Sequence, residues 1–123
     1  MPNFVTTVSS NPITSTGGSA VLKAEIDITE AIPRGNYTFQ WACEIRLQSV
    51  VAGAYAQADL LFNGSTAYQD SHDNDQWHLF AGAGGAFFDG SPGPNFQLVL
   101  SRQGAIAVAE IRRARMTFIQ ETT

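Results

Sequence analysis

The sequence predicts an all-β protein, an antiparallel β-sandwich of the jelly-roll or a related kind, and three observations support this. Apolar and polar residues alternate through two long runs, residues 20–29 and 37–48, as expected for strands with one buried face. Turn-forming residues recur about every 8–12 residues, and no stretch has the period of a helix. The length of 123 residues suits a single domain with its own core.

The first 18 residues contain short β-prone segments, broken by Asn11-Pro12 and ended by a turn-like sequence at residues 15–18. We therefore expect an N-terminal arm or edge strand at residues 1–18 and a single jelly-roll domain at residues 19–123.

The two long runs are expected to form the first two strands of that domain. In the first run the residues expected to face inward are Leu22, Ala24, Ile26 and Ile28, with Lys23, Glu25, Asp27 and Thr29 outward. A turn at residues 33–35 leads to the second run, whose expected inward residues are Tyr37, Phe39, Trp41, Cys43, Ile45 and Leu47. Cys43 is the only cysteine, so we expect a buried, inert thiol and a reducing compartment of synthesis.

The middle of the chain continues this pattern with a turn and a loop. Residues 52–62 alternate with small alanines on one face, which predicts a strand that packs closely against another sheet or another subunit. Asn63-Gly64 predicts a hairpin turn, because both residues tolerate positive φ. The polar stretch Ser65 to Gln76 predicts an exposed loop.

Short strands are expected in the remainder. Residues 77–81 and 86–88 predict two strands joined by the glycine-rich residues 82–85, and residues 89–95 predict a loop. A strand at residues 96–100 and a turn at residues 102–104 lead to two final strands, residues 105–111 and 114–119.

Composition indicates a chain that is partly covered by a partner. Only 15% of the residues are charged, against about 25% in typical globular domains. The net charge of -4 argues against a nucleic-acid partner, which calls for a basic face. The N-terminus lacks the pattern of a signal peptide, and no apolar run approaches the length of a membrane span, so we expect no membrane partner.

Three arginines within four positions form the most distinctive cluster: Arg112, Arg113 and Arg115. Because adjacent strand residues face opposite ways, these side chains must present charge on both faces or lie over a β-bulge. An inward arginine needs an acid or a partner subunit. A solvated edge strand and a contact with a subunit or a capsid are the two interpretations.

Residues that often carry chemistry do not form a catalytic pattern here. Asp70, Asp73 and Asp75 could supply ligands for calcium, but they lack the EF-hand spacing, which favours a solvated loop. His72 and His78 have no partner at zinc-like spacing. We therefore expect no enzymatic activity, no metal and no cofactor.

Further candidate sites have ordinary structural interpretations. Glu44 and Asp59 would suit glycoside cleavage only if their strands were adjacent. The glycines at 82, 84 and 85 do not precede a helix, so a bulge or hairpin is expected instead of a phosphate site. Aromatic residues beside them form either core or a sugar-stacking platform: Trp77, Phe80, Phe87 and Phe88.

Five short motifs follow one another along the chain in a characteristic order. They are Gly35-Asn36-Tyr37-x-Phe39-x-Trp41, Asn63-Gly64, Trp77-x-x-Phe80-x-Gly82, Phe96-x-Leu98-x-Leu100 and Ala109-x-Ile111-Arg112-Arg113-Ala114-Arg115-Met116. This order resembles small jelly-roll virion proteins of tailed bacteriophages, which include capsid decoration or cement proteins and the heads of fibres. The likeness spans roughly residues 20–119.

The resemblance implies a homotrimer of tumour-necrosis-factor-like jelly rolls, made in the host cytoplasm, without enzymatic activity or cofactor. Its partners would be further copies of itself and the major capsid protein, on the capsid surface of the virion. From the strand pattern, the residues expected at the subunit or capsid interface are Phe4, Val5, Arg112, Arg113 and Arg115. The alternative is a fibre head or carbohydrate-binding module that recognises a host receptor through Tyr68, Asp70, Asp73, Asp75 and Trp77.

Overall fold

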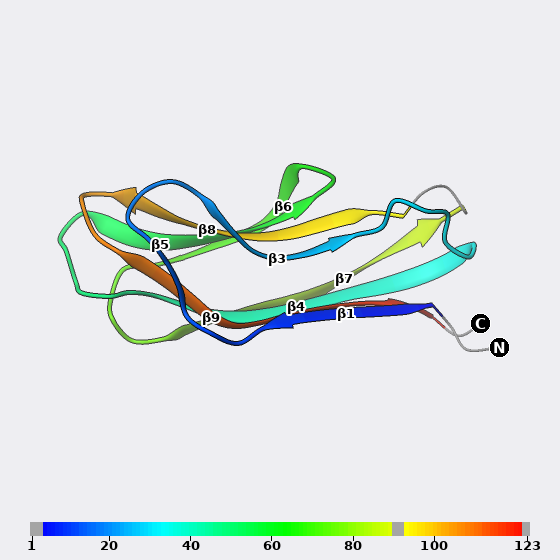
Figure 1. Ribbon diagram of the computed structural model, residues 1–123, viewed down its shortest axis with the longest axis horizontal. Coiled ribbons are helices and arrows are strands. Elements are labelled where there is room, and N and C mark those ends of the chain that lie inside the picture. Colours follow the sequence, from blue (N-terminus) through cyan, green and yellow to red (C-terminus); the bar gives the residue numbers. More distant parts are fainter. Residues whose placement is uncertain (1–3, 90–92, 122–123) are drawn as a thin grey trace.

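The computed structural model describes residues 4–89 and 93–121, which form two antiparallel sheets packed face to face (Figure 1). Sheet A has the order β1 (Val5–Ser10), β9 (Ala109–Gln120), β4 (Gly35–Leu47), β7 (His78–Phe88), and β2 (Thr14–Thr16) also pairs with β9. Sheet B has the order β3 (Val21–Asp27), β8 (Asn95–Gly104), β5 (Ala54–Phe62), β6 (Ser65–His72). The predicted antiparallel sandwich of jelly-roll architecture is confirmed.

Some parts of the predicted elements lie outside the described residues. They are residues 1–3 of the expected arm, residues 90–92 of the expected loop and residues 122–123 at the end of the expected domain. Residues 5–10 pair with β9 as β1, from Val5 opposite Ile119 to Ser10 opposite Ala114. In the part of the chain that the structure describes, no helix is long and apolar enough to cross a membrane.

The core lies between the two sheets and is rich in stacked aromatic rings. All six predicted inward residues of β4 are buried, with exposed fractions of 0–6%. Phe39 of sheet A stacks on Phe96 of sheet B with ring centroids 3.8 Å apart, and Tyr37 stacks on Phe118 of β9 at 4.6 Å. Burial of each such side chain contributes on the order of 2 kcal/mol, so these rings fix how the sheets align.

The prediction for β3 was wrong at its start, where a β-bulge shifts the register between Leu22 and Ala24. Leu22 is 50% exposed and Lys23 is 8% exposed, the reverse of the predicted arrangement. The Lys23 ammonium donates hydrogen bonds to the carbonyl of Pro12 and, at 2.8 Å, to the Thr14 hydroxyl. A buried ammonium must be hydrogen-bonded, so Lys23 ties sheet B to the β1–β2 connection of sheet A.

The predicted loop at residues 65–76 is instead a strand over its first part. β6 pairs with β5 across a two-residue turn at Asn63 and Gly64, whose φ values of 49° and 87° confirm the predicted hairpin turn. Most side chains of β6 are exposed, because β6 is the edge strand of sheet B. An edge strand held by backbone hydrogen bonds needs no apolar alternation, so its sequence looks like a loop.

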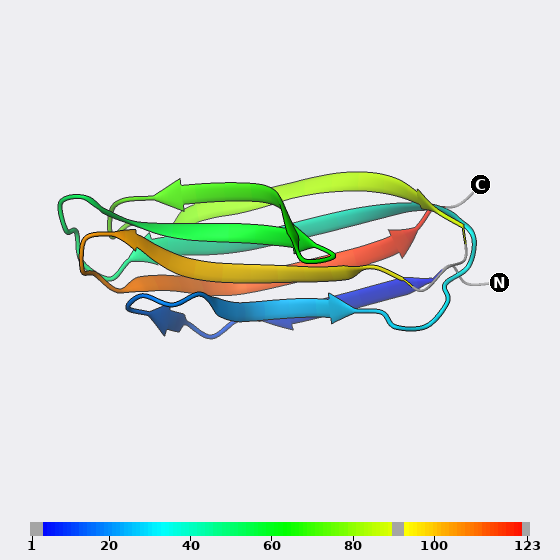
Figure 2. The same cartoon turned by 90° about the horizontal axis from the view of Figure 1, so that it is seen from above.

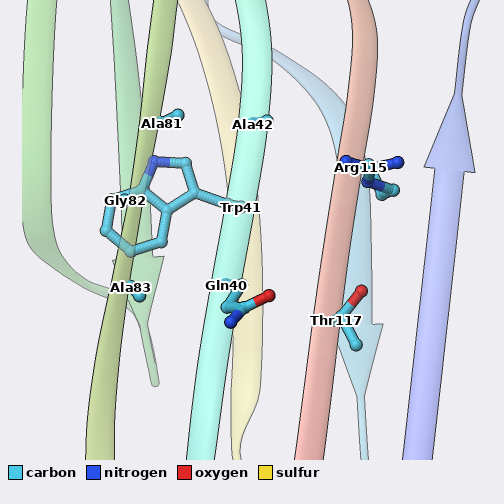
Figure 3. A pocket seen from close by; sticks show the side chains of 8 residues that line it. All are labelled: Gln40, Trp41, Ala42, Ala81, Gly82, Ala83, Arg115 and Thr117. Carbon is cyan, nitrogen blue, oxygen red and sulfur yellow. The ribbon is translucent and has the colours of Figure 1, made fainter.

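The two short strands predicted on either side of residues 82–85 are one continuous strand, β7, paired with β4 from Ile45–His78 to Gly35–Phe88. The glycines therefore do not form a turn. A Cβ atom at Gly82 would lie 2.5 Å from the Trp41 ring, so Gly82 leaves room for that ring (Figure 3).

The two predicted C-terminal strands are likewise one strand, β9, and residues 105–108 lie before it. Arg112 pairs with Glu44 and Arg115 pairs with Ala42, so the register shifts by one residue between them. Arg113 has a φ of 52°, within the left-handed region. The β-bulge considered for the arginine cluster is therefore confirmed.

Candidate interaction surface

The outer side of sheet A carries a broad surface of small and uncharged side chains, which we call the flat face. Its members come from the four neighbouring strands β1, β9, β4 and β7 and are Val5, Thr7, Thr38, Gln40, Ala42, Ala81, Ala83, Gly85, Thr117 and Ile119. Strands lie about 4.8 Å apart and rise about 3.4 Å per residue, so four strands of six or seven residues cover roughly 400 Å². This is about half of one partner's share in a standard protein–protein interface.

Charge is concentrated at one end of the flat face. Glu44 accepts hydrogen bonds from Arg112 at 2.9 Å and from Arg113 at 3.4 Å, and Glu110 accepts one from Arg46 at 2.9 Å. Two of these arginines lie over the Trp77 ring, with the guanidinium carbons of Arg46 and Arg112 at 4.3 and 4.0 Å from its centroid. These charges satisfy one another within the chain.

A shallow recess marks the middle of the flat face (Figure 3). It measures about 180 Å³ and is lined by Gln40, Trp41, Ala42, Ala81, Gly82, Ala83, Arg115 and Thr117. Arg115 is exposed and has no ion-pair partner among residues 4–89 and 93–121. An arginine that stands on a nearly uncharged face is available to a carboxylate of another molecule.

The five predicted interface residues occupy different settings. Val5 is 56% exposed on the flat face, Arg113 is exposed at the bulge of β9, and Arg115 is exposed beside the recess. Phe4 packs inward, with its ring centroid 6.3 Å from both Tyr37 and Phe118, so it belongs to the core. Arg112 is held by Glu44 and Trp77.

The five predicted receptor-loop residues do not converge on one site. Tyr68 and Asp70 are in β6, where Tyr68 packs against Trp41 at 4.5 Å between ring centroids and Asp70 bonds His78 at 2.8 Å. Asp73 and Asp75 lie in the connection to β7. Trp77 faces the outer side of sheet A, where two arginines cover its ring.

The acids and histidines considered for catalysis or metal binding are also placed apart or paired locally. Glu44 is in sheet A and Asp59 is in sheet B, so the strands proposed as neighbours are not adjacent. His72 and His78 stack at 4.6 Å. Within the described ranges no three of the His, Cys, Asp and Glu side chains are grouped to hold a metal ion.

An apolar cavity of about 220 Å³ opens between β6 and β7, at the side where the two sheets separate. Its lining is largely aromatic and includes Tyr37, Phe39, Tyr68, Phe88, Phe96 and Phe118. Sequence reasoning missed this cavity, because both strands that border it were expected to contain loops or turns. The one feature of the sequence that hints at this cavity is the pair of glycines at 84 and 85, which lack side chains and line it.

Cys43 lies at the centre of the core, where burial raises the pKa of its thiol to about 12. Asp70 and Glu44 raise the pKa further by repelling the thiolate, and Lys23 lowers it slightly. The thiol is therefore protonated and unreactive at neutral pH.

The chain resembles known proteins in its fold and not in its sequence. No protein-family model and no curated protein sequence matches it. A chain of the T13 particle of infectious bursal disease virus superimposes with a TM-score of 0.61 at 12% identity, covering 98% of this chain and 32% of the viral one. This chain thus spans about a third of the length of that viral protein.

Two further structures share the architecture. The tumour necrosis factor Eiger of S. frugiperda gives a TM-score of 0.57 at 8% identity, over 99% of this chain and 94% of that one. Latent PorU of Porphyromonas gingivalis gives 0.56 at 8% identity, over 98% of this chain and 13% of that one. The chain therefore shares the jelly-roll fold with chains of viral particles and with a tumour necrosis factor.

Proposed function

We propose that the chain is a non-enzymatic structural protein of a virion, of the capsid decoration or cement type, which acts as a homotrimer on the capsid of a bacteriophage. Viral particle chains with the same fold over 98% of this chain support a virion role. The tumour-necrosis-factor neighbour, matched over 94% of its own length, supports a single jelly-roll domain of this size. The resemblance of the motif order to tailed-phage proteins supports the phage and decoration assignments.

The observation that carries this proposal is the flat face with Arg115 at its centre. A face made largely of alanine, glycine and threonine residues lets another backbone approach closely, and few charges must be desolvated when it is covered. Arg115 then binds a carboxylate of the major capsid protein. A protein that binds only the assembled shell stabilises that shell by mass action.

The test uses empty shells of the major capsid protein encoded by the same genome, mixed with purified protein and sedimented. We expect the wild type to sediment with the shells and Arg115→Gln to bind at least about fivefold more weakly, which corresponds to about 1 kcal/mol per lost charge contact. The matched control is Arg34→Gln, which removes the same charge from an exposed residue beside Phe87. Wild-type protein that stays in the supernatant contradicts the proposal.

The alternative function, a fibre head or receptor-binding module, has weaker support. A sugar-binding tryptophan presents an open ring face, whereas the guanidinium groups of Arg46 and Arg112 lie over the Trp77 ring. Protein that ignores shells but binds defined oligosaccharides on a glycan array would favour this alternative.

A further inference from the structure

The free edge of β7 is the most unusual surface of the molecule. β7 is the last strand of sheet A and pairs on one side only, with β4 (Figure 2 shows β7 along one side of the sandwich). Its 11 residues leave the N–H and C=O groups of every second residue pointing away from the sheet. In the described parts of the chain, no loop makes a backbone hydrogen bond to residues 79–88 from outside the sheet.

The devices that normally protect an edge strand are missing from β7. No charged residue and no proline occurs from Leu79 to Phe88. The pairing with β4 runs without a register shift from Gly35–Phe88 to Ile45–His78, so no bulge turns the edge away. A long, regular and uncharged edge is a template for another strand.

The side chains of β7 are arranged symmetrically about Ala83. On the outer side of sheet A, at the two ends of β7, Leu79 is 62% exposed and Phe87 is 54% exposed, and each lies four residues from Ala83. Only small residues stand between them on that side: Ala81, Ala83 and Gly85.

We propose that β7 pairs antiparallel with β7 of a second copy of this chain, about a two-fold axis at Ala83. The pairing sets Leu79 of each copy opposite Phe87 of the other. The two-fold axis therefore creates two such pairs, and the large exposed side chains of both strands become buried. The small residues at the centre let the two backbones meet without a clash.

The number of hydrogen bonds agrees with a second copy as the occupant. Five or six residues of an 11-residue strand face the partner, which gives about ten inter-strand hydrogen bonds, the number found in a standard interface.

The pairing makes sheet A continuous across two copies and doubles the flat face. In the homotrimer of the proposed function, it would join a subunit of one trimer to a subunit of the next. The edge pairing alone therefore predicts an assembly of two copies, the trimer alone predicts three, and the two together predict six.

Disulfide trapping tests the register. In an antiparallel pair, the two copies of residue 83 have Cα atoms about 4.5–5.5 Å apart, within the range of a disulfide. We expect Ala83→Cys to form a covalent dimer under mild oxidation, seen on a non-reducing gel. Ala81→Cys is the matched control, because its two copies are separated by four residues, or about 14 Å along the strands. Cys43 is fully buried and adds no background.

Light scattering tests the contact itself. We expect Ala83→Lys, which sets two like charges opposite each other, to halve the mass of the assembly while the circular dichroism spectrum is unchanged. The control Thr29→Lys adds the same charge to an exposed residue in the connection after β3, outside the flat face, and leaves the mass unchanged.

The masses of the wild type and Ala83→Lys test the edge pairing and the trimer together. A six-copy wild type and a three-copy Ala83→Lys support both the edge pairing and the trimer. A two-copy wild type and a monomeric variant support the edge pairing and contradict the trimer. Equal masses for wild type and Ala83→Lys, or cross-linking of Ala81→Cys as readily as Ala83→Cys, overturn the proposal.

Discussion

Cys43 shows how the core controls a single ionisable group. The thiol has an exposed fraction of 0% in β4, and its pKa is raised to about 12 chiefly by burial. An acidic group whose folded-state pKa is raised keeps its proton longer in the folded protein than in the unfolded chain. Its contribution to stability is present below the unfolded pKa, about 9, and is lost as the pH rises from there towards 12.

This predicts a pH-dependent difference between the wild type and Cys43→Ala. Between pH 7.5 and pH 10, the free energy of unfolding of the wild type should fall by about 1.4 kcal/mol more than that of the variant. Urea unfolding at both pH values measures the difference, because all other titrating groups are common to both proteins. Parallel pH profiles would show that the thiol is not buried in this way.

The absence of a side chain at Gly82 is needed for the packing of Trp41, which leads to a second prediction. A methyl group there would lie 2.5 Å from Trp41, so Gly82→Ala should lower the free energy of unfolding by about 1–3 kcal/mol. The matched control is Gly85→Ala, whose methyl group lies 3.4 Å from the carbonyl oxygen of Tyr37 and should change stability by less than about 0.5 kcal/mol. Urea unfolding that ranks the two variants equally would contradict the role of Gly82.

The bulge in β9 is the main irregularity among the strands. Arg113 has a φ of 52° there, and its N–H donates to the carbonyl of Asn11 at 3.2 Å. The bulge therefore anchors the connection between β1 and β2. It also lets Arg112 reach Glu44 while Ala114, with an exposed fraction of 0%, returns to the core.

The bulge predicts opposite effects for two neighbouring substitutions. Arg113→Gly should raise the free energy of unfolding by up to about 1 kcal/mol, because glycine adopts the left-handed conformation without strain. Arg115→Gly, in the regular part of the same strand, should lower it by a similar amount. Thermal unfolding of both variants gives the comparison, and a loss of stability in Arg113→Gly would contradict strain at the bulge.

Strands set by a local sequence pattern were predicted correctly, whereas strands set by contacts with distant residues were not. The alternation of β4 is local and uninterrupted, so its buried face could be named from the sequence. The phase of β3 depends on Lys23 reaching Pro12 and Thr14 in another sheet, which no local pattern encodes. Glycine marks both turns and close contacts, and at Gly82 the contact is made by Trp41 of the neighbouring strand.

The candidate surface could be anticipated only in part for the same reason. The arginine cluster signalled a bulge or an interface, because three charges in four positions conflict with the two-residue period. The flat face depends instead on the register of β4 with β7 and β9. Side chains such as Ala42 and Ala81 become neighbours only through that pairing.

At the scale of the whole molecule, the N-terminal residues are part of the sandwich. β1 pairs with β9 over six residues, and Phe4 and Val8 pack against the core. Removal of residues 1–10 should therefore lower the free energy of unfolding by more than about 3 kcal/mol, since it deletes buried apolar side chains and exposes β9. Urea unfolding of the truncated chain measures this, and an unchanged midpoint would indicate a detachable arm.

The position of β9 determines when the protein can fold as it is synthesised. β9 is the last strand along the chain, yet it lies inside sheet A between β1 and β4 (Figure 1). Until residue 120 has left the ribosome, β1 has no neighbouring strand and β4 has only one. The nascent chain must therefore keep β1 and β4 out of wrong pairings, and the sandwich closes in one late step.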